Sequence, residues 1–288
     1  MDPLILPVAL FSAFCFALAL VLTRFGLRTL SPMAGAGISV PSTAAMFVVL
    51  APLTIDWHGY ATQPALMFAA VGVVFPVAVT LLTFAANRRI GPDLTGALGN
   101  LSPVFAVALA ALLLDEVPTP GQAGGIAAVC IGVVLMLGGR GGAGAGAFPA
   151  WALALPLLAA AVRGTIQPVI RLGLQDWADP FAAVTIGYVI SAVIALGITR
   201  KSPLAAIRAG GHWFVAVGIA NGLAVLTLYM ALGLGPVTLV APLVACYPLF
   251  TMVLNRAIHG DRSMTKRTGI GIALTVAGIA ALLALRHG

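Results

Sequence analysis

One arginine stands in the middle of a long apolar segment. Arg163 lies about midway along the run 150–172, where an arginine costs roughly 2.5–3.5 kcal/mol on membrane-insertion scales. Gln167 follows one helical turn later on the same helix face, and Pro168 then frees a backbone carbonyl. One interpretation is that Arg163 binds a carboxylate or another anion inside a cavity. The alternative is that Arg163 pairs with freed carbonyls and only fixes helix packing.

Other polar residues recur at helical spacing within further apolar runs. Such groups need hydrogen-bond partners or water in hydrocarbon. Together they predict a hydrated cavity wall for an amphipathic solute, although any one of them could be an interhelical hydrogen bond worth about 0.6 kcal/mol. The tyrosines also offer rings to an apolar group. The candidate substrate-binding residues are Arg163, Gln167, Asn100, Thr80, Asn221, Tyr229, Tyr247 and Thr251.

Several prolines lie inside the apolar runs and are expected to bend their helices. Pro103 and Pro248 occupy matching places in the two halves of the chain, which makes them the candidate hinges. Glu116 and Asp261 also match, at helix ends. The two acids are interpreted either as solvated or helix-end groups, or as parts of a gate salt bridge.

The sequence lacks the motifs of several other functions. No acidic residue or histidine is expected at the centre of an apolar run, which disfavours proton-driven export of cationic drugs. GxxxxGK[ST] is missing, so no ATP site is expected. Gly139, Gly141 and Gly144 satisfy GxGxxG, but a flexible linker is the better interpretation. The three cysteines are interpreted as buried apolar residues. We expect no catalytic residues, no metal, no cofactor and no nucleic acid partner.

The composition of the chain indicates that the segments carrying these residues lie in a lipid bilayer. Of 288 residues, 61% are hydrophobic and 8% are charged, far from the roughly 45–50% and 25% of soluble domains. The apolar runs are continuous rather than alternating, so helices are expected and not a barrel. The first run is interpreted as an uncleaved span. The ten predicted spans are 4–23, 33–54, 65–87, 93–114, 121–138, 150–172, 181–199, 212–233, 237–257 and 268–286.

The two halves of the chain repeat each other. Six short matches occur in the same order at offsets of 144 to 148, among them Gly91-Pro92 with Gly235-Pro236 and Ser102-Pro103 with Tyr247-Pro248. Five spans in each half would place the second half upside down, as in secondary transporters that bind solute at the repeat interface. The predicted fold is an all-α integral membrane protein of ten helices in two inverted five-helix repeats around a central cavity. The predicted units are 1–137, a Gly/Ala-rich linker 138–149, and 150–288.

These motifs resemble the EamA-type repeat of the drug/metabolite transporter superfamily. The resemblance rests on Gly91-Pro92, the segments 102–105 and 112–116, and the glycines from Gly125 to Gly132, and it covers essentially the whole chain. It implies ten helices around a central cavity and transport of amino acids, other metabolites, nucleotide sugars or drugs. In size and repeat type the chain resembles bacterial amino-acid and metabolite exporters of the inner membrane.

Charge predicts the orientation. Twelve Lys and Arg residues lie in one set of loops and span ends, against two on the side of the termini. Because cationic loops favour the cytoplasm, the count places both termini outside, whereas the family resemblance implies the reverse.

The leading functional hypothesis is an exporter or facilitator of small amphipathic solutes, foremost amino acids including aromatic ones, that works by alternating access. A nucleotide-sugar or other metabolite exchanger is the alternative, followed by a multidrug exporter. A membrane enzyme or a non-transporting scaffold represents a different class. The expected partners are the solute and the lipid bilayer, and no oligomer is required.

Overall fold

The computed structural model describes residues 2–138, 149–199, 211–259 and 266–284, and all regular elements among them are helical. Short 3₁₀ turns cover Trp57–Gly59 and Ala150–Leu153. The α-helices are α1 Ile5–Gly26, α2 Pro32–Thr54, α3 Thr62–Val74, α4 Val77–Gly99, α5 Ser102–Leu113, α6 Pro120–Gly138, α7 Ala154–Asp176, α8 Pro180–Ile198, α10 His212–Leu234, α11 Val237–Val244, α12 Tyr247–His259 and α13 Lys266–Ala284.

Two helices begin within a residue of the predicted span starts at 33 and 181, and a side chain caps each of them. Ser31 caps α2 by accepting a hydrogen bond from the Ala34 N–H at 3.3 Å, and Pro32 opens the helix. At the matching place in the second half, Asp179 accepts bonds from the first N–H groups of α8, and Pro180 follows. A side-chain oxygen at the cap satisfies N–H groups that have no partner within the helix, and proline lacks the N–H there. These two predicted helix starts are confirmed.

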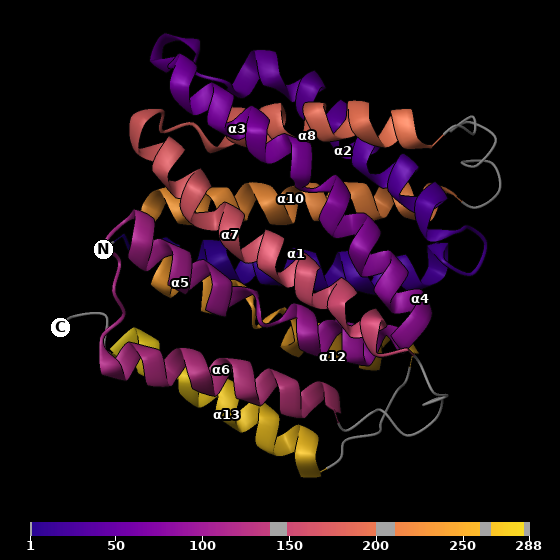
Figure 1. Ribbon diagram of the computed structural model, residues 1–288, viewed down its shortest axis with the longest axis vertical. Coiled ribbons are helices and arrows are strands. Elements are labelled where there is room, and N and C mark those ends of the chain that lie inside the picture. The colour runs from indigo at the N-terminus through magenta and orange to yellow at the C-terminus, as the bar shows by residue number, and fades with distance from the viewer. Residues whose placement is uncertain (1, 139–148, 200–210, 260–265, 285–288) are drawn as a thin grey trace.

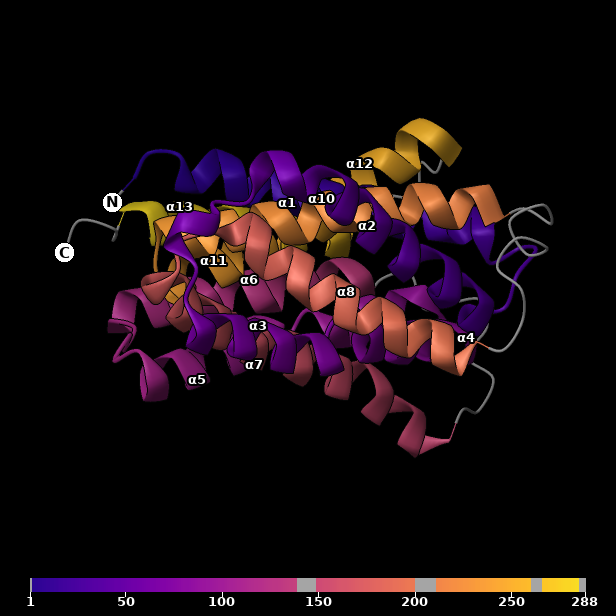
Figure 2. The ribbon, with the colours of Figure 1, turned by 90° about the horizontal axis from the view of Figure 1, so that it is seen from above.

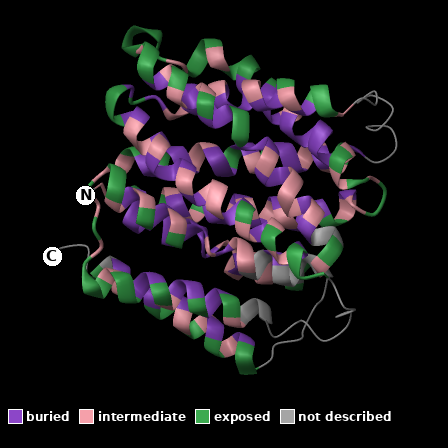
Figure 3. Cartoon of the chain, viewed as in Figure 1, coloured by how far each residue is buried: buried purple, intermediate pink, exposed green. Residues whose placement is uncertain are grey.

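Seven segments are long and apolar enough to cross a membrane, judged by length and composition over the described residues. Two shorter apolar helices, Ser102–Leu113 and Pro120–Leu135, accompany them. Exposed residues on the outer helices include many large hydrophobic side chains, and buried residues concentrate in the inner helices (Figure 3). This exposed apolar surface suits a lipid environment, in which helices pack through close contact rather than by hiding apolar area from water. The chain is a multi-pass membrane protein.

The predicted break between the spans 65–87 and 93–114, which contains Gly91-Pro92, is wrong. Helix α4 continues through both residues from Val77 to Gly99, so Asp93 also lies within a helix rather than at a span end. The chain leaves helical geometry earlier, at Phe75, which is extended before Pro76. A residue before proline disfavours the helical region, whereas helices in membranes tolerate Gly and Pro where neighbouring groups satisfy the freed backbone. The same local signal therefore breaks the chain at one place and not at the other.

Two helix breaks match across the halves. The fourth predicted run is divided between α4 and α5, and the ninth between α11 and α12. Pro103 and Pro248 stand second in the helix after each break. Backbone bonds at the two breaks correspond one to one: Leu101 N to Leu98 O, Val104 N to Leu101 O, Cys246 N to Leu243 O, and Leu249 N to Cys246 O. Both prolines therefore adjoin true interruptions, while movement at these places stays a prediction.

Several helix contacts correspond when the two halves of the chain are exchanged. Helix α1 packs on α10 and α12, while α7, its counterpart, packs on α3, α4 and α5. Helices α2 and α8 pack on each other, as do α6 and α13, which lie side by side at one edge of the bundle (Figures 1 and 2). Two matched hydrogen bonds follow the same rule. Thr43 Oγ1 donates to the Gly218 carbonyl at 2.6 Å, and Ser191 Oγ donates to the Gly72 carbonyl at 2.6 Å.

Glycines set the direction of the α6–α13 pair. A Cβ at Gly125 would meet Gly278, and a Cβ at Gly132 would meet Gly271. The partner number falls as the residue number rises, so the two helices run antiparallel. Gly125 and Gly132 are the counterparts of Gly271 and Gly278. Exchanging the two halves of the chain therefore gives the same two glycine contacts, so this interface is self-complementary.

Replacement of Gly278 by alanine is expected to destabilise the protein. The new Cβ would lie 2.8 Å from the Gly125 carbonyl oxygen and 2.9 Å from the Val129 nitrogen. Backbone atoms cannot move aside as a flexible side chain does, so we expect a cost of about 1–3 kcal/mol and a lower melting temperature in detergent. Gly269→Ala is the matched control on α13, since nothing lies within 4 Å of its Cβ. Equal melting temperatures for both variants would contradict this packing.

Candidate functional site

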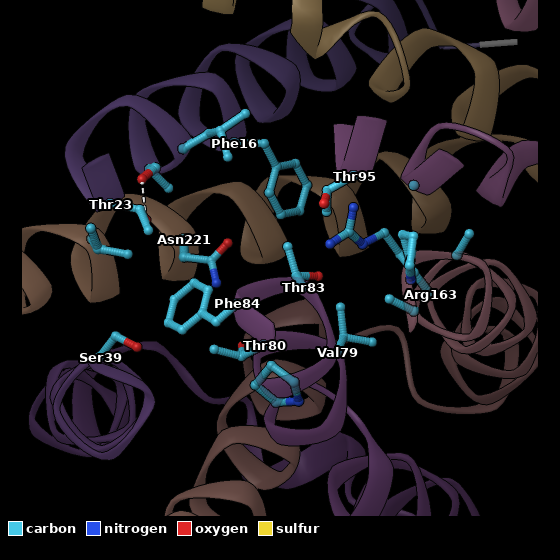
Figure 4. Close-up of a pocket in the computed structure, with 18 of the residues that line it drawn as sticks. Phe16, Thr23, Ser39, Val79, Thr80, Thr83, Phe84, Thr95, Arg163 and Asn221 are labelled. Carbon is cyan, nitrogen blue, oxygen red and sulfur yellow. Dashed lines mark hydrogen bonds between the residues drawn. The ribbon is translucent and has the colours of Figure 1, made fainter. Parts of the chain in front are cut away.

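A cavity with a mainly apolar lining that carries several polar side chains lies within the half of the bundle away from the start of α1 and the end of α13. Its walls come from the C-terminal half of α1, the N-terminal halves of α2, α7 and α10, and from α4. Its volume is about 100 Å³, where one water needs roughly 10–15 Å³, so the space suits several waters or part of a small solute. Besides Arg163 and Tyr247, its polar lining residues are Thr23, Ser39, Thr80, Thr83, Thr95 and Asn221 (Figure 4).

Arg163 carries the only formal charge among the described lining residues. Its Nε is buried and has no hydrogen-bond partner in the described part of the chain. The guanidinium carbon lies 5.9 Å from the centre of the Phe16 ring, a cation–π geometry, and the Tyr247 hydroxyl lies beside the guanidinium. A fixed cation with an unused donor can bind a carboxylate.

Four of the eight predicted binding residues line this cavity. They are Arg163 on α7, Thr80 on α4, Asn221 on α10 and Tyr247 at the start of α12. They come from both halves of the chain, so the fold brings together residues that are far apart in sequence. Val217 also lines the cavity, because it lies four residues before Asn221 on the same face of α10.

The other four predicted residues lie outside the cavity lining. Gln167 is buried and donates through Nε2 to the Arg163 carbonyl at 3.3 Å. Asn100 is buried at the α4–α5 break, and its side-chain amide has no described partner. Tyr229 is 2% exposed, and Thr251 Oγ1 donates to the Tyr247 carbonyl at 3.1 Å. A polar residue on the same helix as a cavity residue can face the packed side.

Sequence reasoning did not select five of the polar and aromatic lining residues that figure in the site. They are Phe16, Thr23, Ser39, Phe84 and Thr95. Phe16 and Thr23 stand seven apart on α1, with Leu20 between them also in the lining, which is the spacing of one helix face. Thr83 was not chosen either, although it follows Thr80 by three residues, which is less than one helical turn. Ser39 and Thr95 gave no sequence signal, because each is a lone hydroxyl in an apolar run.

The end of the bundle on the side of the termini is held by an ion pair. Glu116 Oε1 lies 2.7 Å from Arg171 Nε, and the two side chains are 14% and 19% exposed. Glu116 Oε2 also accepts a hydrogen bond from the Val237 N–H at 2.6 Å, at the start of α11. Arg171 donates to the Leu232 carbonyl at the end of α10. Glu116 is thus both a paired and a helix-end group, and it connects three helices. Asp261, its predicted match, lies outside the described residues.

Together, the spans, the matched halves and the cavity between the helices define a multi-pass membrane protein built from a tandem repeat. The sequence matches the EamA-like transporter family twice, over residues 4–138 and 150–284. The chain belongs to this family, a part of the drug/metabolite transporter superfamily. Membership indicates a membrane transporter of small solutes.

Comparison with solved structures supports the fold. One structure, described only as "Crystal structure of protein", has a TM-score of 0.73 at 20% identity, and the match covers 99% of each chain. In all, 28 chains of solved structures match. At this identity the likeness shows the fold alone. None of the curated proteins matches the chain.

Proposed function

We propose that the chain is a secondary transporter of small amphipathic carboxylates, foremost amino acids including aromatic ones. The observation that carries this proposal is Arg163, a cation in the cavity wall whose Nε has no partner among the described residues. A carboxylate supplies the negative charge that the described lining lacks. The rings of Phe16, Phe84 and Tyr247 in the same wall suit an apolar group.

The proposal includes the architecture of ten spans in two inverted repeats, with the units 1–137, 138–149 and 150–288. The antiparallel α6–α13 pair and the corresponding helix contacts of the two halves support the inversion. Such repeats carry solute by exposing a central site to each side in turn. The cavity lies in one half of the bundle, and the Glu116–Arg171 pair closes the other. Pro103 and Pro248, at matched breaks, are the proposed hinges.

We place both termini outside the cell, in a bacterial-type inner membrane. Twelve cationic residues against two support this orientation. The cavity would then face the cytoplasm in this conformation, ready to accept a solute for export. No cofactor, metal or second subunit is needed for this cycle.

Counterflow in proteoliposomes tests the proposal. The panel contains neutral and aromatic amino acids, a nucleotide sugar and a cationic dye. We expect aromatic amino acids to exchange, because one cation is sparse for a multiply charged phosphate and the described cavity wall has no acid for a cationic dye. Movement of the nucleotide sugar alone or of the dye alone would replace the substrate assignment with one of the two alternatives.

A further inference from the structure

The cavity has two chemically different ends. In Figure 4, Arg163 lies at one side, while Thr23, Ser39 and Asn221 lie at the other. Phe16 and Thr83 lie between these two groups in the same view. The side away from Arg163 carries amide and hydroxyl groups but no charge.

Helix packing places Asn221 and Ser39 together. A Cβ at Gly218 would lie 2.5 Å from the Ser39 carbonyl, so α10 and α2 touch at this level. Asn221 follows Gly218 by less than one turn of α10. The Thr43 bond to the Gly218 carbonyl fixes the same crossing one turn beyond Ser39. These polar groups therefore stand on a rigid helix contact.

Asn221 is half-buried and lines the cavity, yet its side chain has no hydrogen bond to any described residue. A carboxamide offers two donors and an acceptor. In a site of low dielectric an unpaired amide is costly, so a solute that pairs with it gains affinity. The partner that fits is a hydroxyl, which can donate to and accept from the amide, or a ring N–H, which can donate to the amide oxygen.

We propose that Asn221, supported by Ser39 and Thr23, forms a second recognition end for a hydroxyl or ring N–H at the far end of the carboxylate solute. The inference rests on the proposed function, because the carboxylate at Arg163 orients the solute. Such a cavity prefers a solute with polar groups at both ends, and it selects tyrosine over phenylalanine.

Competition for counterflow tests this preference with two solutes that differ by one hydroxyl. Uptake of labelled phenylalanine into proteoliposomes is inhibited by unlabelled phenylalanine or tyrosine, and the ratio of the two inhibition constants is measured. We expect tyrosine to bind about 3- to 10-fold more tightly in the wild type, the size of one hydrogen bond. The pair 3-phenylpropanoate and 3-(4-hydroxyphenyl)propanoate should give the same ratio, since the amino group takes no part in it.

Asn221→Leu removes the amide at similar volume and should bring the tyrosine-to-phenylalanine ratio to about one. Ser39→Ala is a smaller change that should bring the tyrosine-to-phenylalanine ratio closer to one without reaching it. It provides the test if Asn221→Leu folds poorly. Thr227→Val is the matched control on α10, where Thr227 Oγ1 bonds to its own helix and lies outside the cavity lining. It should keep the wild-type ratio.

The outcomes separate this inference from the proposed function. A ratio of one in the wild type, or an unchanged ratio in both Asn221→Leu and Ser39→Ala, would overturn the second recognition end. If phenylalanine still exchanges and needs Arg163 in that case, the proposed function stands alone. If neither amino acid competes, both proposals fail.

Discussion

Arg163→Gln is expected to lower carboxylate counterflow by about 100-fold, because truncating one partner of a buried charge pair costs about 2–5 kcal/mol. Glutamine keeps hydrogen-bonding capacity and removes the charge. The measurement is the initial rate of phenylalanine exchange in proteoliposomes at matched protein content. Arg163→Lys keeps the charge without the planar guanidinium and should retain part of the rate.

The melting temperature of the same variant distinguishes binding from packing. In the wild type, Nε of Arg163 is buried without a described partner, so removal of the charge should leave the stability unchanged or raise it. If Arg163 only fixes helix packing, Arg163→Gln should melt well below the wild type. A large drop in the melting temperature with exchange retained would refute the binding role.

Loss of the Glu116–Arg171 pair is expected to open the end of the bundle near the termini. Glu116→Gln leaves Arg171 largely buried without its charge partner, at a cost of about 1–3 kcal/mol, and a tenfold change in an opening equilibrium needs about 1.4 kcal/mol. A reporter cysteine at Val240, fully buried on α11 next to this end, should react roughly tenfold faster with a thiol reagent. The background for this measurement replaces Cys15, Cys130 and Cys246, which are all free and buried.

A charge exchange supplies the control for this ion pair. Glu116→Arg combined with Arg171→Glu restores opposite charges, but Glu116 also accepts from the Val237 N–H, which an arginine cannot do. We therefore expect the double variant to recover only part of the protection of Val240→Cys. Unchanged reactivity of the reporter in Glu116→Gln would show that this pair does not hold the end closed.

Sequence patterns predicted the fold well because composition and repetition are global signals. Every predicted span overlaps a helix, and the prolines at 103 and 248 were found because each has a counterpart in the other half. The break predicted at Gly91-Pro92 failed because its signal was local. The counterpart, Gly235-Pro236, does separate α10 from α11, so the repeat itself favoured the wrong assignment.

Half of the predicted binding residues line the cavity, because the spacing of residues along a helix does not fix which face of the helix turns toward the cavity. Arg163 stood out by its cost in a membrane, and its position in the cavity wall agrees with that argument. Gln167 was placed beside it by spacing, yet it packs behind the cavity. Short polar side chains such as Ser39 and Thr95 carry no cost that marks them in the sequence. Only the packing of α2 and α4 against the other helices brings them to the cavity.

Discrimination between an acid and its amide tests the central claim most directly. Phenylalanine and phenylalaninamide share a ring and an amino group and differ in the carboxylate. The account predicts that wild type prefers the acid by about tenfold or more in competition for counterflow, and that Arg163→Gln treats both alike. Equal competition by acid and amide in the wild type, or a preference that survives in Arg163→Gln, would contradict the assignment of Arg163 as the carboxylate site.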